Sequence, residues 1–310
     1  MKKIAVVGSL NMDIVVKVDH MPKVGETIMG HGLAYIPGGK GANQACAAGR
    51  LGGNAVMLGK VGGDQFGDAL VANLAAAGVE TGRIQRSRQP TGTALITVNN
   101  QGNNSIVVAP GANSDCDIAY ADACRDVWEA ADVVMLQMEI PHEAVYHLVR
   151  EAKKAGKTVI LNPAPAVRQF PDALYSDIDY ITPNETELEI LTGMEVGTPE
   201  EIAAAADSLL RKGAGRVLVT CGPMGALLAG RQGWKLYGVA DVKVVDTTAA
   251  GDTFNAAFAV ALTEGRSEAE AVAFANKAAT LAVIREGAQI SIPSRDDVER
   301  FDELVAPNLK

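Results

Sequence analysis

The stretch VVDTTAAGDTFNAAFAVAL, residues 244–262, places a carboxylate beside a run of small residues at the start of an apolar helix. We expect a strand at 242–245, a loop from Thr247 to Gly251, and a helix at about 252–263. A helix start presents free N–H groups and a positive dipole end, which would stabilise charge on a transferred phosphoryl group. Asp252 could accept the proton of an attacking hydroxyl, or it could only complement the helix dipole.

A second glycine-rich stretch, PGGKGANQA at 37–45, presents Lys40 and Asn43 before a small-residue helix. The pattern G-x-x-x-x-G-K-[ST] fails here, because Ala34 takes the first glycine position and Gly41 follows the lysine. Asn43 offers a donor and acceptors, which suit a vicinal diol. A tight turn that leads into a closely packed helix remains the alternative.

Further oxygen-bearing side chains follow other expected strands. Asn11 and Asp13 lie on the same side of an extended segment, although such residues also simply make turns. Glu139 could bind hydroxyls or cap the next helix. Asn184 and Glu187 share one face of a helix's first turn, where they would suit a magnesium ion that keeps several waters, or form a cap.

The elements that must position these residues alternate between strand and helix patterns along most of the chain. This alternation predicts an α/β fold, with a mostly parallel central sheet and helices on both faces. In such sheets ligands bind beyond the carboxyl ends of the strands, where the glycine-rich TCGPMG follows the strand 216–220. One helix is expected at 118–130 and another at 268–284.

Two clusters of strand patterns interrupt the alternation, at about 11–36 and 91–110. The first includes a strand at 28–35, and the second is built around the hairpin signal NNQGNN. We interpret them as one small β-sheet, a lid inserted into a single α/β domain that spans 1–310.

Composition narrows the function classes. The net charge of −9 argues against a general nucleic-acid or anionic-membrane surface, so an anionic ligand must be held by local groups. The cysteines form no C-x-x-C pair, which favours free thiols in a reducing cytoplasm. No apolar run reaches the roughly 18 residues of a membrane span, and we expect a cytoplasmic protein.

Together, GGKGANQA and DTTAAGDTFNAAF resemble the two signatures of the ribokinase-like carbohydrate kinases, and NPAPA, TPNETE and TCGPMG strengthen that resemblance over about 4–293. The resemblance implies phosphorylation of D-ribose at its 5-hydroxyl by MgATP, with Asp252 as the base that deprotonates this hydroxyl. It also implies a homodimer formed through the lid. Ala256 and Asn276 depart from commoner family forms, in the region of the adenine pocket.

The same resemblance implies the remaining site residues, group by group. The anion hole would be the backbone amides of Ala249, Ala250 and Gly251. The sugar would contact Asn11, Asp13, Gly39, Lys40, Asn43, Glu139 and Asp252. ATP would contact Asn184, Thr220, Gly222, Gly225, Gly251 and Asn276. Magnesium would lie near Asn184 and Glu187, held largely through phosphates and water. Potassium would be bound, much of it by carbonyl oxygens, at Asp246, Thr248, Ala282, Arg285, Gly287 and Ser291.

Other functions stay open at this point. The nearest is a related kinase for deoxyribose, another sugar or a nucleoside, although the lid segments offer little aromatic surface beyond Tyr35 for a base. A non-catalytic sugar sensor would have no use for Asp252 as a base. A dehydrogenase is disfavoured, because no convincing G-x-G-x-x-G follows a strand.

Overall fold

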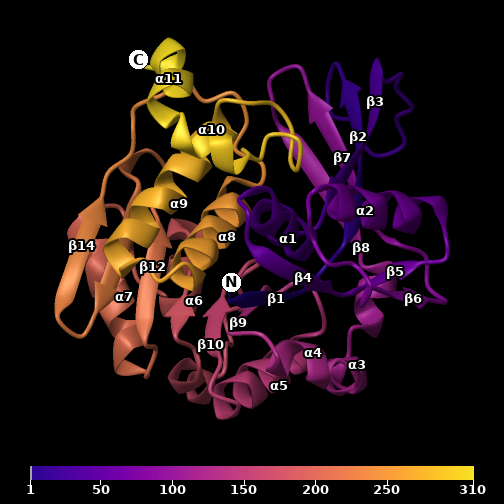
Figure 1. Cartoon of the computed structure of the whole chain (residues 1–310). Coiled ribbons are helices and arrows are strands. Elements are labelled where there is room, and N and C mark those ends of the chain that lie inside the picture. The colour runs from indigo at the N-terminus through magenta and orange to yellow at the C-terminus, as the bar shows by residue number, and fades with distance from the viewer. Residues whose placement is uncertain (1) are drawn as a thin grey trace.

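The large sheet lies at the centre of the molecule, in a computed structural model that describes residues 2–310 (Figure 1). Its strands are β1 (Lys3–Val7), β4 (Asn54–Leu58), β9 (Val133–Leu136), β10 (Thr158–Leu161), β11 (Tyr180–Ile181), β12 (Arg216–Thr220), β13 (Ala226–Gly230) and β14 (Gly233–Tyr237). Their order is β14-β13-β12-β11-β10-β9-β1-β4. The strands from β12 to β4 run parallel, and β13 and β14 continue the sheet as antiparallel neighbours. The expected α/β fold with a mostly parallel sheet is confirmed.

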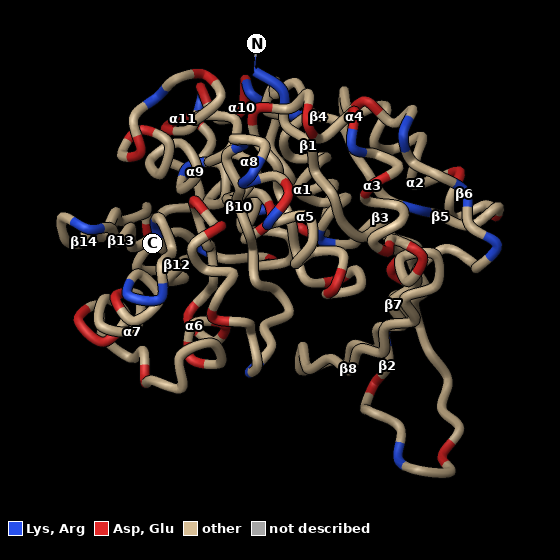
Figure 2. The backbone as a smooth tube through the Cα atoms, turned by 90° about the horizontal axis from the view of Figure 1, so that it is seen from below, with Lys and Arg blue, Asp and Glu red and all other residues tan. Residues whose placement is uncertain are grey.

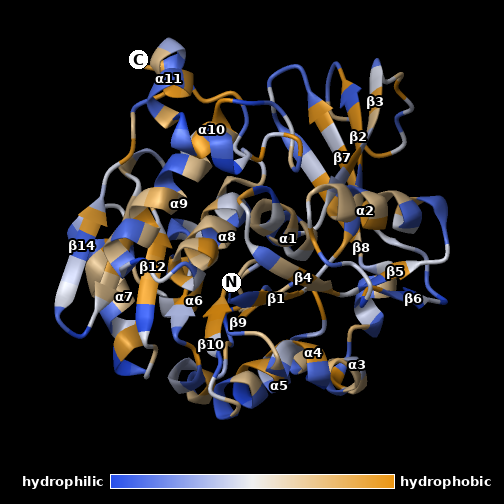
Figure 3. Ribbon diagram, in the orientation of Figure 1, coloured by the Kyte–Doolittle hydropathy of each residue, from blue (hydrophilic) through white to orange (hydrophobic). Residues whose placement is uncertain are grey.

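Helices cover both faces of this sheet, because alternate strand residues feed two separate apolar cores. Ile4 and Val6 of β1 point into one core, whereas Ala5 and Val7 point into the other. Figure 3 shows the hydrophobic character of these central strands. The first core is covered by α1 (Lys40–Arg50), α2 (Gln65–Ala76), α8 (Ala250–Thr263), α9 (Glu268–Val283), α10 (Arg295–Glu299) and α11 (Phe301–Val305). The second is covered by α3 (Ile118–Ala123), α4 (Arg125–Glu129), α5 (His142–Lys154), α6 (Glu185–Thr192) and α7 (Pro199–Arg211).

A small separate sheet projects from one side of the molecule (Figure 1). It consists of β3 (Gly32–Gly38), β2 (Asn11–Val18), β7 (Gly92–Asn99) and β8 (Asn104–Ala109), in that order. These strands come from the two segments that sequence patterns single out, so the predicted small sheet is confirmed. Its edge strand β8 is exposed along its whole length, and Figure 2 shows few charged residues on β2, β7 and β8. A short pair, β5 (Lys60–Gly62) and β6 (Gln85–Ser87), was not expected.

Three local predictions were wrong. Residues 242–245 form no strand, because their backbone lies beside the C-terminal tail and the end of α9 instead of a sheet neighbour; Val242 bridges Leu309, and Val245 N–H bonds Val283. The helix expected at 118–130 is interrupted at Cys124, which leaves helical geometry. The strand expected at 28–35 is β3, which starts four residues later, at Gly32.

In the described part of the chain, residues 2–310, no helix combines the length and apolarity needed to cross a bilayer.

Candidate active site

The start of α8 lies at the centre of the site. Its N-cap, Ala249, has a left-handed backbone with φ of 61°, a strained conformation for a residue that is not glycine. The Ala250 amide donates to the Thr247 carbonyl over 3.2 Å, so it would have to release this bond to reach an anion. The Gly251 amide donates to no acceptor within residues 2–310, and Gly251 lines a cavity.

Asp252 is buried, with 6% of its surface exposed. Its carboxylate accepts hydrogen bonds from Asn43 Nδ2 at 2.9 Å and from Gln44 Nε2 at 3.1 Å. Burial raises the pKa of Asp252, while the positive charge of Lys40 and the two amide bonds act in the opposite direction. A buried carboxylate with a raised pKa is suited to accept a proton from a hydroxyl.

The glycine-rich stretch brings the start of α1 against β1 and β2. Gly39 has φ of 87°, and a Cβ there would lie 2.7 Å from the backbone nitrogen of Asn11. A Cβ on Gly41 would lie 2.6 Å from Gly8 of the chain that leaves β1. These contacts require glycine. They bring Lys40 next to Glu139, whose Oε2 accepts from the Lys40 amide at 3.0 Å.

Asn11 and Asp13 come from the first strand of the small sheet. The Asn11 Oδ1 accepts from Asn113 at 2.8 Å, which fixes the orientation of its amide. Burial, with the negative charge of Glu139, raises the pKa of Asp13 to about 7. A Cβ on Gly38 would lie 2.4 Å from the Asp13 carboxylate, so β3 also needs glycine beside this residue.

A cavity of about 600 Å³ opens beside the start of α8. It is lined by all the residues that the sequence assigned to ATP: Asn184, Thr220, Gly222, Gly225, Gly251 and Asn276. Apolar side chains, including Phe254 and Val283, line it as well. The Asn276 side-chain amide donates to the carbonyl of Tyr237 at 2.9 Å. The cavity combines a mainly apolar lining with a few polar groups, which is typical of small-molecule sites. We call it the nucleotide cavity, after the ligand that the sequence predicts for these residues.

Asn184 and Glu187 form a reciprocal cap at the start of α6. Asn184 Oδ1 accepts from the Glu187 amide at 2.8 Å, and the Glu187 carboxylate accepts from the Asn184 amide at 2.9 Å. Burial raises the pKa of Glu187. Within residues 2–310, no cluster of three or more His, Cys, Asp or Glu side chains could hold a metal ion. A metal here would therefore take most of its ligands from phosphates and water.

Three of the residues assigned to potassium, Asp246, Thr248 and Gly287, are in contact and come from two segments. Asp246 Oδ2 accepts from the Gly287 amide at 3.0 Å, and Asp246 Oδ1 accepts from the Thr248 hydroxyl at 2.6 Å. Burial acts to raise the pKa of Asp246, but the hydrogen bonds from Thr248 and Gly287 outweigh burial and lower this pKa. The Arg285 guanidinium pairs with Asp297 at 3.0 Å, which leaves its backbone carbonyl as the possible ligand. Ala282 is buried in the last turn of α9, and Ser291 is buried in the segment between α9 and α10.

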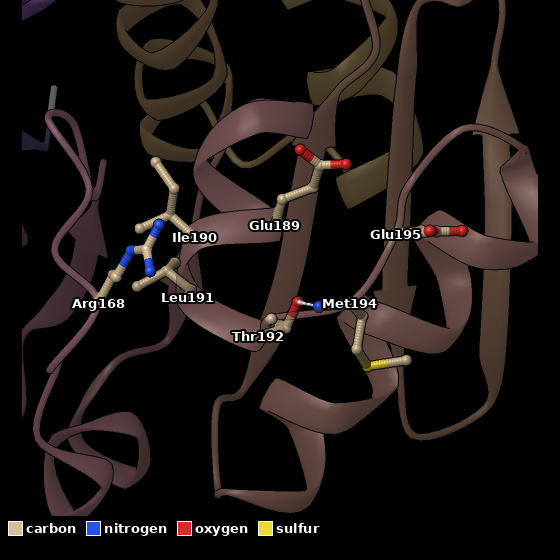
Figure 4. A pocket seen from close by; sticks show the side chains of 8 residues that line it. Arg168, Glu189, Ile190, Leu191, Thr192, Met194 and Glu195 are labelled. Carbon is tan, nitrogen blue, oxygen red and sulfur yellow. Dashed lines mark hydrogen bonds between the residues drawn. The ribbon is translucent and has the colours of Figure 1, made fainter.

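A second hollow, of about 590 Å³, lies around the C-terminal end of α6 (Figure 4). It is lined by Arg168 and residues 189–195, none of which was predicted to have a chemical role. The Thr192 hydroxyl there accepts from the Met194 amide at 3.2 Å, an ordinary helix-end contact. This hollow is separate from the residues around Asp252.

Comparison with known proteins decides the family. A model of the pfkB family of carbohydrate kinases matches residues 1–295. The chain belongs to this family. A ribokinase of Bacillus subtilis is 43% identical over 302 residues, which cover 97% of this chain and 99% of that protein. A deoxyribokinase of Salmonella typhi is 39% identical, over 98% of this chain and 99% of that protein.

Solved structures of this pfkB fold agree closely with the chain. Ribokinase of Thermotoga maritima superimposes with a TM-score of 0.90 at 40% identity, and covers 98% of this chain and 100% of that one. Ribokinase of Arabidopsis thaliana complexed with ribose and ATP has a TM-score of 0.91 at 37% identity, and covers 97% and 98%.

Sequence reasoning missed several buried polar residues of this pfkB site. Gln44 bonds Asp252 directly and lies inside the GGKGANQA stretch, one residue after Asn43, so its position was a usable signal. Gln137 follows β9 and Gln289 follows α9, and both reach the site only through other amides. Ser9, which donates to Glu139 at 2.6 Å, also went unnoticed. The contacts of Gln137, Gln289 and Ser9 depend on the fold and carry no local sequence pattern.

Proposed function

We propose that the protein transfers the γ-phosphoryl group of ATP to the 5-hydroxyl of D-ribose, giving D-ribose 5-phosphate. The observation that carries this proposal is the position of Asp252. It directly follows Gly251, which lines the nucleotide cavity, and it accepts hydrogen bonds from the Asn43 and Gln44 side chains of the GGKGANQA stretch. The ribokinase relatives and the ribose and ATP complex of the Arabidopsis protein support this substrate pair.

The sugar would lie among Asn11, Asp13, Glu139 and the start of α1. An ionised carboxylate accepts strong hydrogen bonds from hydroxyls, and an amide can both donate and accept, so this group of side chains can orient a polyol. Lys40 lies among these acids and gains charge stabilisation from Asp252, Glu139 and Glu187, which outweigh burial and raise its pKa. The sugar site thus binds through hydrogen bonds that fix orientation.

Asp252 and the anion hole would then act together in the phosphoryl-transfer step. Asp252 accepts the proton as the 5-oxygen attacks the γ-phosphorus, a contribution of about 10²- to 10⁴-fold in comparable enzymes. The Gly251 amide and the helix dipole stabilise the negative charge on the transferred group. Alignment of the two substrates on either side of Asp252 supplies much of the remaining rate.

Mg²⁺ and K⁺ belong to this proposal. Mg²⁺, held near Asn184 and Glu187 mainly through phosphate oxygens and water, would neutralise charge on the nucleotide when bound. For K⁺ we propose the turn where Asp246 and Thr248 meet Gly287, close in sequence to the anion hole. Its donor set of carbonyl and carboxylate oxygens fits a hard cation.

The decisive experiment replaces Asp252 with Asn, which keeps the shape and removes the base. We expect turnover, measured as ADP release with ribose, to fall by at least about 10²-fold while ribose still binds in calorimetry. Asp302→Asn, an exposed change on α11, is the matched control. Near-normal turnover of the Asp252 variant would refute the assignment of the base.

Deoxyribose is the second candidate substrate, because the Salmonella typhi deoxyribokinase is nearly as similar as the ribokinases. The two sugars differ by one hydroxyl, and a site that bonds this hydroxyl should reject the sugar that lacks it. An ADP-release panel of ribose, 2-deoxyribose, other pentoses and nucleosides separates these possibilities. Failure to release ADP with any pentose would favour a non-catalytic sugar sensor.

We also propose that the small sheet acts as a lid over the sugar and as a dimer interface. Its edge strand β8 exposes Ile106, Val107 and Val108, each more than half accessible, and Leu95 of β7 is 51% exposed. Unpaired, exposed apolar strands are favourable sites for association between sheets. A second copy would cover this surface. A cytoplasmic location, favoured by four buried and unpaired cysteines, completes the proposal.

A further inference from the structure

The two amides that donate to Asp252 are each held by a further amide. On one side, Gln289 Nε2 donates to Asn43 Oδ1 at 3.0 Å, and Asn43 Nδ2 donates to Asp252 Oδ2 at 2.9 Å. On the other side, Gln137 Nε2 donates to Gln44 Oε1 at 2.7 Å, and Gln44 Nε2 donates to Asp252 Oδ1 at 3.1 Å. Two parallel chains of hydrogen bonds therefore end on the same carboxylate.

These chains are buried, so water cannot replace a missing partner. Gln44 and Gln137 have no exposed surface, and Gln289 has 2%. The two outer glutamines come from different parts of the fold: Gln137 directly follows β9, and Gln289 lies in the turn between α9 and α10, where Asn73 of α2 donates to its Oε1. The carboxylate is thus tied to the end of a central strand and to the turn that follows α9.

The chemistry of the groups determines which way each amide points. An ionised carboxylate only accepts, so Asn43 and Gln44 must turn their NH₂ groups toward Asp252. Their oxygens then face away and need donors, which Gln289 and Gln137 provide. When Gln137 donates to Gln44, its own Oε1 stays buried without a partner within residues 2–310, which costs stability.

We propose that Gln137 and Gln289 are positioning residues for the phosphoryl transfer, which hold Gln44 and Asn43 in the orientation that donates to the base. The inference rests on the proposed role of Asp252. Without the outer amides, Asn43 or Gln44 could rotate and present an oxygen to the carboxylate, which would repel it or bring a proton onto it. The base would then be misplaced or already protonated.

The test inverts one outer amide at a time by Gln137→Glu or Gln289→Glu, which keep the side-chain shape but turn a donor into an acceptor. We expect kcat for ribose to fall about ten- to hundred-fold, the range of one inverted buried hydrogen bond, with KM for ATP changed less than about threefold. Gln232→Glu, the same substitution in the exposed turn of the β13–β14 hairpin, should leave both constants unchanged.

The pH profile separates positioning from a merely structural effect. The charged groups that act on Asp252 in wild-type protein are Lys40 of α1, Glu139 after β9 and Glu187 of α6, and the variants leave them in place. In Gln137→Glu, protonation of the new carboxyl restores a donor, so the variant's kcat relative to wild type should recover as pH falls. A purely structural loss would not recover in this way.

Companion variants keep the test decisive if a glutamate prevents folding. Gln137→Met and Gln289→Met remove the donor without adding charge, and should lower kcat several-fold. In an Asp252→Asn background, none of these changes should lower the residual turnover further. The proposal is overturned if folded variants keep kcat within twofold of wild type, or if the loss persists equally in that background. A turnover that survives Asp252→Asn itself would refute the proposed function instead.

Discussion

Replacing Asp13 with Asn should stabilise the ligand-free protein and lower its affinity for the sugar. Burial and the negative charge of Glu139 raise the pKa of Asp13 from 3.8 to about 7. This difference corresponds to about 4 kcal/mol, the free energy that the folded protein loses by keeping Asp13 ionised above pH 7. Because water and local relaxation reduce such penalties, we expect Asp13→Asn to increase the free energy of unfolding by about 2 kcal/mol at pH 8.

The stability gained by Asp13→Asn should increase with pH. Below pH 4 Asp13 is protonated in both the folded and the unfolded chain, so the ionisation penalty vanishes. Between pH 4 and 7 the folded chain keeps a proton that the unfolded chain has released, and wild-type stability falls as pH rises. The advantage of the Asn variant should therefore grow from pH 5 to pH 8. Urea unfolding at both pH values measures it, with the exposed Asp302→Asn as control.

Asp13→Asn should bind ribose more weakly, although it is more stable. An ionised carboxylate holds hydroxyls by charge-assisted bonds worth about 1.5–3 kcal/mol, so KM for ribose should rise about ten- to hundred-fold in Asp13→Asn. KM for ATP should change little, since Asp13 does not line the nucleotide cavity. An equal stability gain at pH 5 and pH 8, or no gain at pH 8, would contradict the assumed burial of this charge.

Three further changes test the site and its surroundings. Gly39→Ala should destabilise the protein by about 2 kcal/mol more than Gly52→Ala in urea unfolding, because both glycines have positive φ but only Gly39 lies against backbone atoms. Asp246→Asn should abolish the stimulation of turnover by KCl over choline chloride at equal ionic strength; persistent stimulation would place the cation elsewhere. Ile106→Glu on β8 should shift sedimentation from dimer to monomer, whereas Ile118→Glu on α3 should not, and a dimer that survives both changes would need another interface.

Much of the fold could be predicted because periodic patterns report burial directly. The strand at 216–220 and the helix at 268–283 are marked by runs and spacings of apolar residues, and the structure places both within a residue of the expectation. The segment 242–245 shows the limit of this logic. Val244 and Val245 favour a strand, yet they are 51% and 55% exposed, since a strand also needs a neighbour and sequence does not reveal one.

The site was predictable where a residue type has few other uses. Glycine at position 39 is informative because few residues tolerate its positive φ and close backbone contacts. An acid at the start of a helix is less informative, because it often only complements the helix dipole. Asn184 and Glu187 were ambiguous, and the structure does place them in a helix cap. Gln137 and Gln289 could not be found, because an isolated glutamine is usually a surface residue and only the folded chain brings these two toward the base.

The charges that line the cavity beside α8 determine which groups can hold a polyphosphate there. The charged side chains that line the nucleotide cavity are Glu185, Asp241 and Lys310, of which only Lys310 is positive. A polyphosphate must therefore be held by helix-start amides and by cations that come with it, since the protein's net charge of −9 offers no basic surface. Burial makes ionised Asp252 costly, and Lys40 with two oriented amides offsets part of that cost. A neutral sugar suits such surroundings, because it adds hydroxyl donors to the carboxylates without adding charge.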